Sequence, residues 1–157
     1  MKFKFTILYI ILIVAVNYGF SVVPLVPVLG EMFPPMSLIV GFIFVARDYA
    51  QREINHKVIF AMLLAAVLSY LMADPFVALA SLAAFTFSEL ADWGVYSFTK
   101  KPFYQRVLLS SILASPIDSF IFLALIGQFS IIGASLMTAS KIIGALVVWG
   151  VTRESKV

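Results

Sequence analysis

Residues 75–98 read PFVALASLAAFTFSELADWGVYSF, and this stretch decides how the chain folds. Its first half carries no charge, and the stretch is longer than the roughly 20 residues that a helix needs to cross a bilayer core. Two carboxylates, those of Glu89 and Asp92, then interrupt it. Two questions follow: which environment suits so apolar a helix, and what charged groups do inside it.

The composition of the whole chain answers the first question. Of 157 residues, 62% are hydrophobic and 12% are charged, whereas a soluble domain has about 25% charged residues. We therefore predict an all-α integral membrane protein with one domain, residues 1–157, and six transmembrane helices. The predicted helices are 5–23, 35–51, 57–73, 75–98, 104–126 and 131–151.

The basic residues predict the orientation of these helices. Ten of the eleven Lys and Arg residues fall on one side of the predicted bundle: Lys2, Lys4, Arg47, Arg52, Lys57, Lys100, Lys101, Arg106, Arg153 and Lys156. The opposite side holds only Glu31 and Asp74 among charged residues. The positive-inside rule then places both termini in the cytoplasm. The net charge of +3 reflects this topology and does not indicate nucleic-acid binding.

Several motifs of chemistry are missing from the sequence. There is no cysteine, and the single histidine, His56, lies in a predicted turn without a second metal ligand nearby. We predict no metal site and no cofactor, and His56 is interpreted as a solvated loop residue. No catalytic motif occurs, so we predict that the chain is not an enzyme and has no catalytic residues. An intramembrane enzyme using two acids as general acid and base stays an alternative.

Two further segments have structural interpretations. Small residues recur every fourth position in two predicted helices, at Ala61, Ala65, Ser69 and Ala73 and at Ala80, Ala84 and Ser88. Such stripes favour close helix packing in lipid. The segment 24–35, PLVPVLGEMFPP, has four prolines and predicts an extended external connection.

Four charged residues fall inside the predicted membrane helices: Glu89, Asp92, Asp118 and Lys141. Each costs about 2.5–3.5 kcal/mol at the centre of a transmembrane helix, so together they would cost on the order of 10 kcal/mol if they were unpaired. Glu89 and Lys141 both lie near the predicted middle of the membrane, so a contact between them is geometrically possible. We interpret the four as a ladder around one cavity. The alternative is an ion-paired network that only fixes packing.

The neighbours of these charges predict a binding site. One face of 75–98 carries aromatic rings alternating with carboxylates, at Phe85, Glu89, Asp92 and Tyr96. The helix 104–126 has a matching stripe, at Ser111, Ser115, Asp118 and Phe122, with Pro116 inside it. These side chains suit a flat heterocyclic ligand: aromatic rings can stack on its faces, and carboxylates can accept hydrogen bonds from its N–H groups. Near the cytoplasmic side, Arg47 and Asp48 form either a gate with Arg106 or Arg52 or a solvated interfacial pair.

Four segments, in order, resemble the vitamin uptake transporter (VUT) family, which includes queuosine-precursor transporters. They are FVARDYAQR (44–52), SELADWGVYSF (88–98), SPIDSFIFLALIG (115–127) and TASKIIGALV (138–147). The resemblance implies a six-helix inner-membrane protein that imports deazaguanine bases such as cyano-deazaguanine. It also implies a fold similar to the substrate-binding subunits of energy-coupling-factor vitamin transporters.

The resemblance also implies roles for individual residues. The positions that match the family pattern are Asp48, Glu89, Asp92, Asp118, Ser119 and Lys141. Ser115 departs from it, because relatives commonly have Asn there, which leaves the detailed substrate open. The expected partners are a deazapurine-like small molecule and the lipid bilayer. A coupling ATPase module and homo-oligomerisation stay open, as do uptake of another vitamin-like heterocycle and a purely structural role for an ion-paired core.

Overall fold

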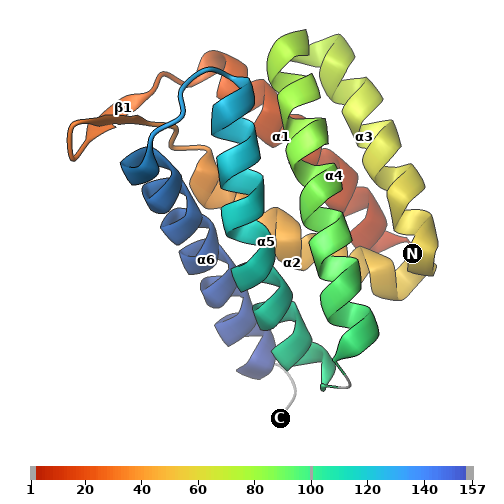
Figure 1. Ribbon diagram of the computed structural model, residues 1–157. Helices are drawn as coiled ribbons and strands as arrows, with labels where there is room; N and C mark the ends of the chain where they lie inside the picture. Colours follow the sequence, from red (N-terminus) through yellow and green to blue (C-terminus); the bar gives the residue numbers. More distant parts are fainter. Residues whose placement is uncertain (1–2, 100, 155–157) are drawn as a thin grey trace.

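The computed structural model describes residues 3–99 and 101–154, except for the side chains at 92, 93, 96, 97, 103, 104 and 152–154. It is a helical bundle with one short hairpin (Figure 1). The elements are α1 (Lys4–Val22), β1 (Val26–Val28), β2 (Glu31–Phe33), α2 (Ser37–Ile54), the one-turn 3₁₀-helix η1 (Asn55–Lys57), α3 (Val58–Met72), α4 (Pro75–Phe98), α5 (Phe103–Leu125) and α6 (Ile131–Glu154). All six predicted helices are present, with each boundary within three residues of its predicted position.

Polar side chains cap two of these helices at their first turns. The Asp74 carboxylate accepts a hydrogen bond from the Val77 N–H at 3.0 Å, and Pro75 occupies the first position of α4. Proline is favoured there because that N–H needs no partner within the helix. Before α6, the Ser130 hydroxyl accepts from the Gly133 N–H at 2.8 Å. Each cap satisfies a backbone donor that the helix itself leaves unpaired.

The proline-rich segment 24–35 forms the hairpin, which confirms the prediction of an extended connection. β1 and β2 pair antiparallel and bring Val28 opposite Glu31. Between them, Leu29 and Gly30 have positive φ angles of 51° and 81°. Two consecutive residues in this region form the tight turn that matches the twist of a hairpin.

The helices alternate in direction, so the connections gather at two ends of the bundle (Figure 1). The start of α1, the α2–α3 turn, the α4–α5 connection and the end of α6 lie at one end. The hairpin and the α3–α4 and α5–α6 turns lie at the other. At the first end, the Glu53 carboxylate accepts hydrogen bonds from the N–H groups of Phe5 and Thr6 at 3.1 and 2.9 Å, which ties the start of α1 to the end of α2.

The expectation of six separate membrane spans is not met as stated. Within the described residues, four stretches are long and apolar enough to cross a membrane: Lys4–Val22, Ser37–Met72, Gln105–Leu125 and Ile131–Val151. The second stretch runs through α2, η1 and α3 together, because only one 3₁₀ turn separates the two helices. Within the described part of α4, Pro75–Ala91 is a shorter apolar stretch. The helices are therefore consistent with a membrane protein, while six crossings stay a proposal.

Packing in the bundle relies on small residues, as the stripes predict. Ala61, Ala65 and Ser69 are buried on α3, which packs against α1. There, the Asn17 side-chain amide donates to the Ser69 hydroxyl at 3.0 Å.

The closest helix contact is between α2 and α6, and it depends on two glycines. A Cβ atom added to Gly144 would lie 2.6 Å from the backbone carbonyl oxygen of Leu38. One added to Gly41 would collide with the backbone carbonyl of Lys141. Since backbone cannot move aside as a flexible side chain can, the two helices approach this closely only with glycine at both positions.

We expect Gly144→Ala to lower the free energy of unfolding by about 1–3 kcal/mol, the usual cost of an overpacked contact. Thermal unfolding of the detergent-purified protein measures this. Gly150→Ala on the same helix is the matched control, because nothing lies within 4 Å of a Cβ atom built there. Equal stability of the two variants would contradict the close α2–α6 contact.

Candidate functional site

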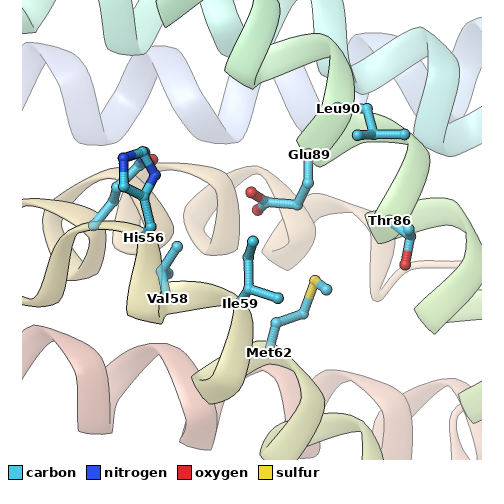
Figure 2. Close-up of a pocket in the computed structure, with 8 residues that line it drawn as sticks. His56, Val58, Ile59, Met62, Thr86, Glu89 and Leu90 are labelled. Carbon is cyan, nitrogen blue, oxygen red and sulfur yellow. The ribbon is translucent and has the colours of Figure 1, made fainter.

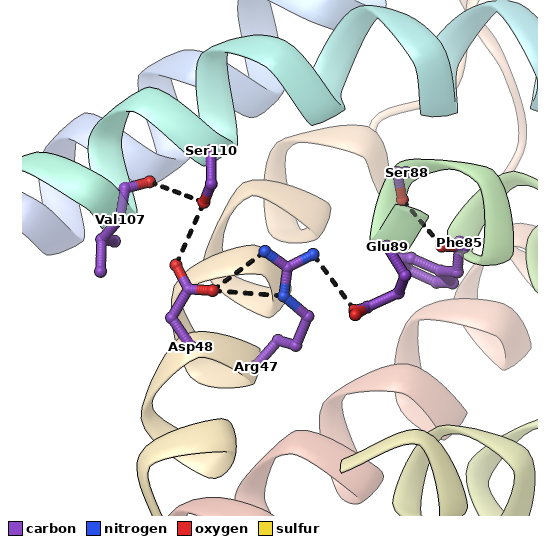
Figure 3. Close-up of polar contacts among 7 residues, drawn as sticks. All are labelled: Arg47, Asp48, Phe85, Ser88, Glu89, Val107 and Ser110. Atoms are coloured by element: carbon purple, nitrogen blue, oxygen red, sulfur yellow. Dashed lines mark hydrogen bonds and ion pairs between the residues drawn. The ribbon is translucent and has the colours of Figure 1, made fainter. Parts of the chain in front are cut away.

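Three charged side chains meet in the interior of the bundle (Figure 3). The Arg47 guanidinium, from α2, lies between two carboxylates: it contacts Asp48 at 2.9 Å and Glu89, from α4, at 3.1 Å. The other Asp48 oxygen accepts from the Ser110 hydroxyl of α5 at 3.3 Å. This chain of contacts connects α2, α4 and α5.

The burial of these groups sets their energetics. The side chain of Arg47 is 1% exposed and that of Glu89 16%, so the ion pair runs from the interior toward a solvent-accessible wall. A buried guanidinium is tolerated only if its charge and its N–H donors are matched. Asp48 accepts hydrogen bonds from Nε and Nη2 at 3.3 and 2.9 Å, Glu89 balances the charge at Nη1, and the centre of the Phe44 ring lies 5.8 Å from the guanidinium carbon. Arg47 is therefore a buried structural centre, and the interpretation of the pair as solvated is wrong.

A second ion pair joins α5 and α6. The Lys141 ammonium is fully buried and contacts the Asp118 carboxylate, which is 4% exposed. It also donates to the Ser119 hydroxyl at 3.0 Å. Its one positive and one negative charge cancel, so the group is suited to holding two apolar helices together.

Glu89 and Lys141 are not in contact, although their depth in the membrane would allow it, because each of them pairs with a different residue of opposite charge. Glu89 pairs with Arg47, whose position near the end of α2 had suggested an interfacial anchor. Lys141 pairs with Asp118 across the α5–α6 contact. Among the described members of the predicted ladder, Glu89 therefore belongs to one cluster and Asp118 and Lys141 belong to another.

The remaining predicted residues take different places. Phe85 and Phe122 are core residues: Phe85 packs edge-on against Phe44 and Phe122 packs against Phe20. Ser115 is buried and donates to the backbone carbonyl of Ser111 at 2.6 Å.

The last three predicted residues are Arg106, Asp92 and Tyr96. Arg106 is half-buried on α5, one helical turn before Ser110. The side chains of Asp92 and Tyr96 lie outside the described part of the structure.

A cavity of about 390 Å³ lies between the α2–α3 turn, α3 and α4 (Figure 2). Its lining residues are Gln51, His56, Val58, Ile59, Met62, Thr86, Glu89 and Leu90. The exposed side chains of His56 and Leu90 show that it opens to the surface. Among the described lining residues, Glu89 is the only charged one, so the Arg47 cluster reaches this cavity through the Glu89 carboxylate.

Reasoning from the sequence missed part of this site. Ser110 was passed over in favour of the adjacent Ser111, although Ser110 is the residue that holds Asp48. His56 is exposed, as predicted, yet it forms part of the cavity wall. Thr86 also lines the cavity, and its position one turn before Glu89 in SELAD was the available signal.

The chemistry of the cavity is that of a hydrogen-bond acceptor in an apolar pocket. A carboxylate surrounded by aliphatic side chains binds ligands that offer adjacent N–H groups or a positive charge. Within the described residues, no group of three His, Cys, Asp or Glu side chains is placed to hold a metal ion.

Comparison with known proteins adds no relative to this picture. No family model, curated protein or solved structure matches the chain. Membership of the vitamin uptake transporter family therefore stays a prediction from the four sequence segments.

We expect Lys141→Met to destabilise the protein by about 3–5 kcal/mol, because it leaves the buried Asp118 carboxylate without its counter-charge. The double variant Lys141→Met/Asp118→Leu should recover most of this loss, since it removes both buried charges. Thermal unfolding in detergent, measured for the parent, both single variants and the double variant, gives the coupling between them. Additive losses would show that the two side chains do not form an ion pair.

Proposed function

We propose that this chain is a multi-pass inner-membrane protein that imports a queuosine precursor, a deazaguanine base such as cyano-deazaguanine. The observation that carries this proposal is the Glu89 carboxylate, held by Arg47 on one side and lining an apolar cavity on the other. The four sequence segments that resemble the family supply the substrate class. Glu89 lies in one of them and Arg47 in another.

The arrangement of the helices supports a membrane crossing with both ends in the cytoplasm. The start of α1 and the end of α6 lie at the same end of the bundle (Figure 1). Lys4, Arg52 and Lys57 belong to that end, as the positive-inside rule requires of a cytoplasmic face. In this arrangement all six helices cross the membrane, and α4 can do so because its Glu89 carboxylate contacts Arg47 inside the bundle. The cavity beside His56 then opens toward the cytoplasm.

The chemistry of the cavity fits a deazaguanine. The ring N–H and the exocyclic amino group of such a base are adjacent donors, which a carboxylate accepts in parallel. Ile59, Met62 and Leu90 offer apolar surfaces for the faces of a flat ring. The volume of about 390 Å³ lies within the range of about 300–1,000 Å³ typical of small-molecule sites.

Energy coupling is left open by this proposal. The sequence has no phosphate-binding loop of the GxxxxGK[ST] type, so uptake is facilitated, ion-coupled or driven by a separate ATPase module. Import of another vitamin-like heterocycle is the nearest alternative, because the cavity chemistry suits any flat donor-bearing ring. A purely structural role is favoured for the Lys141–Asp118 pair, which is neutral and fully buried.

We expect Glu89→Gln to reduce uptake of cyano-deazaguanine at least about tenfold, the equivalent of losing one charge-assisted hydrogen bond. The chain is expressed in bacteria that neither make nor import queuosine precursors, and queuosine in tRNA is read by boronate-gel mobility. Glu31→Gln in the hairpin is the matched control, expressed to the same level.

Two results would overturn the proposal. If the well-expressed parent chain yields no queuosine, this substrate is wrong. If Glu89→Gln imports as well as Glu31→Gln, the cavity carboxylate does not bind the substrate.

A further inference from the structure

Met62, from α3, separates two cavities. It lines the cavity that holds Glu89, and it also lines a second one of about 10 Å³. The side chain of Met62 is 6% exposed, so it fills the space between them. Figure 2 shows it beneath Glu89 and Thr86, at the inner side of the larger cavity.

The second cavity continues the first along the bundle. On α4 the lining residues pass from Glu89 and Thr86 in the first cavity to Ser81 and Ala78 in the second. On α3 they pass from Met62 to Ala66, away from the end that holds the α2–α3 turn. Ala78 lies three residues after the start of α4, which is roughly 5 Å along the helix axis. Together the cavities follow the seam between α1, α3 and α4 almost to its far end.

The second cavity contains an unsatisfied polar group. Asn17, from α1, lines it and is 2% exposed. Its amide nitrogen donates to Ser69, whereas its Oδ1 atom has no hydrogen-bond partner among the described residues. A buried acceptor without a partner is destabilising, so this atom favours a ligand that can donate to it. Ser81, 5% exposed, adds a hydroxyl to the same wall.

We propose that this seam is the path by which the substrate crosses the protein, with Met62 as the barrier and Asn17 and Ser81 as a second polar binding position beyond it. This inference rests on the proposed function. A donor-bearing heterocycle leaving Glu89 finds its next acceptor at Asn17 Oδ1. At about 10 Å³ the second cavity holds no more than one water molecule, so the structure has this position closed.

The residues around the barrier suit a path that opens and closes. Methionine has three rotatable bonds and no branch, so it changes rotamer at low cost. Beyond it, Ala66 and Ala78 leave room as soon as α3 and α4 separate slightly. The α2–α6 contact differs, because there the backbones of the two helices pack directly against each other at Gly41 and Gly144.

The first test blocks the second cavity and leaves the first intact. Ala66→Leu fills the space beyond Met62, and Ala66 does not line the Glu89 cavity. We expect detergent-purified Ala66→Leu to bind labelled cyano-deazaguanine in equilibrium dialysis like the parent, while uptake by vesicles falls to the level of vesicles without the protein. Ala139→Leu, at an exposed position of α6, should bind and import like the parent.

The second test needs no substrate, because the chain has no cysteine of its own. Ser81→Cys is exposed to a cationic methanethiosulfonate reagent in vesicles whose N-terminal face points outward. We expect Met62→Ala to raise the labelling rate of this cysteine several-fold, since it removes the barrier. Met72→Ala, 60% exposed on the same helix, should leave the rate unchanged.

These tests separate the path from the substrate. Import by Ala66→Leu at the parent rate, or a labelling rate that Met62→Ala does not change, would overturn the path. If the parent itself neither binds nor imports cyano-deazaguanine, the proposed function fails, and labelling alone decides the path. Thermal unfolding of each variant shows that it has folded.

Discussion

The burial of Arg47 is the constraint on which the rest of the structure depends. A guanidinium that is 1% exposed in an apolar bundle must have its charge and its donors matched by groups that three helices bring to it. Asp48 lies beside it on α2, Glu89 reaches it from α4, and Ser110 of α5 holds Asp48 in place. A shift of α4 by one residue would leave the charge of Arg47 without Glu89, and a shift of α5 would remove the hydrogen bond from Ser110 to Asp48. The ion pair thus sets the register of α2, α4 and α5.

The two charged clusters have different relations to solvent. Lys141 and Asp118 cancel each other in the core, far enough from any surface that neither is more than 4% exposed. Glu89, in contrast, has Arg47 behind it and a cavity of about 390 Å³ in front of it. A carboxylate has acceptor positions for more than one partner, so Glu89 can accept hydrogen bonds from a ligand while it contacts Arg47. Under the proposed function, the Lys141–Asp118 pair therefore serves stability and Glu89 serves recognition of the substrate.

Some helices of the bundle pack closely and others leave cavities between them, a difference that suits the proposed transport. α2 and α6 are in backbone contact at Gly41 and Gly144, which fixes them as one unit. Both cavities lie between α3 and α4, the larger one beside the α2–α3 turn and the smaller one beside α1, and the flexible side chain of Met62 lines both. A bundle with one rigid contact and one loosely filled seam can open at the seam without losing its core.

The sequence by itself determined the helical class, the helix positions and the buried charges. In a bilayer, a long apolar segment forms a helix because the helix satisfies all its backbone hydrogen bonds internally. A charged side chain inside such a segment must face a partner within the protein. Proline spacing likewise predicted the extended segment 24–35. Only the tertiary structure decided which charges pair. Depth along the helices allowed Glu89 to contact Lys141, but the depth of a residue does not determine how its helix is rotated about its own axis. Packing between the helices fixes that rotation, and as a result Glu89 pairs with Arg47 and Asp118 pairs with Lys141.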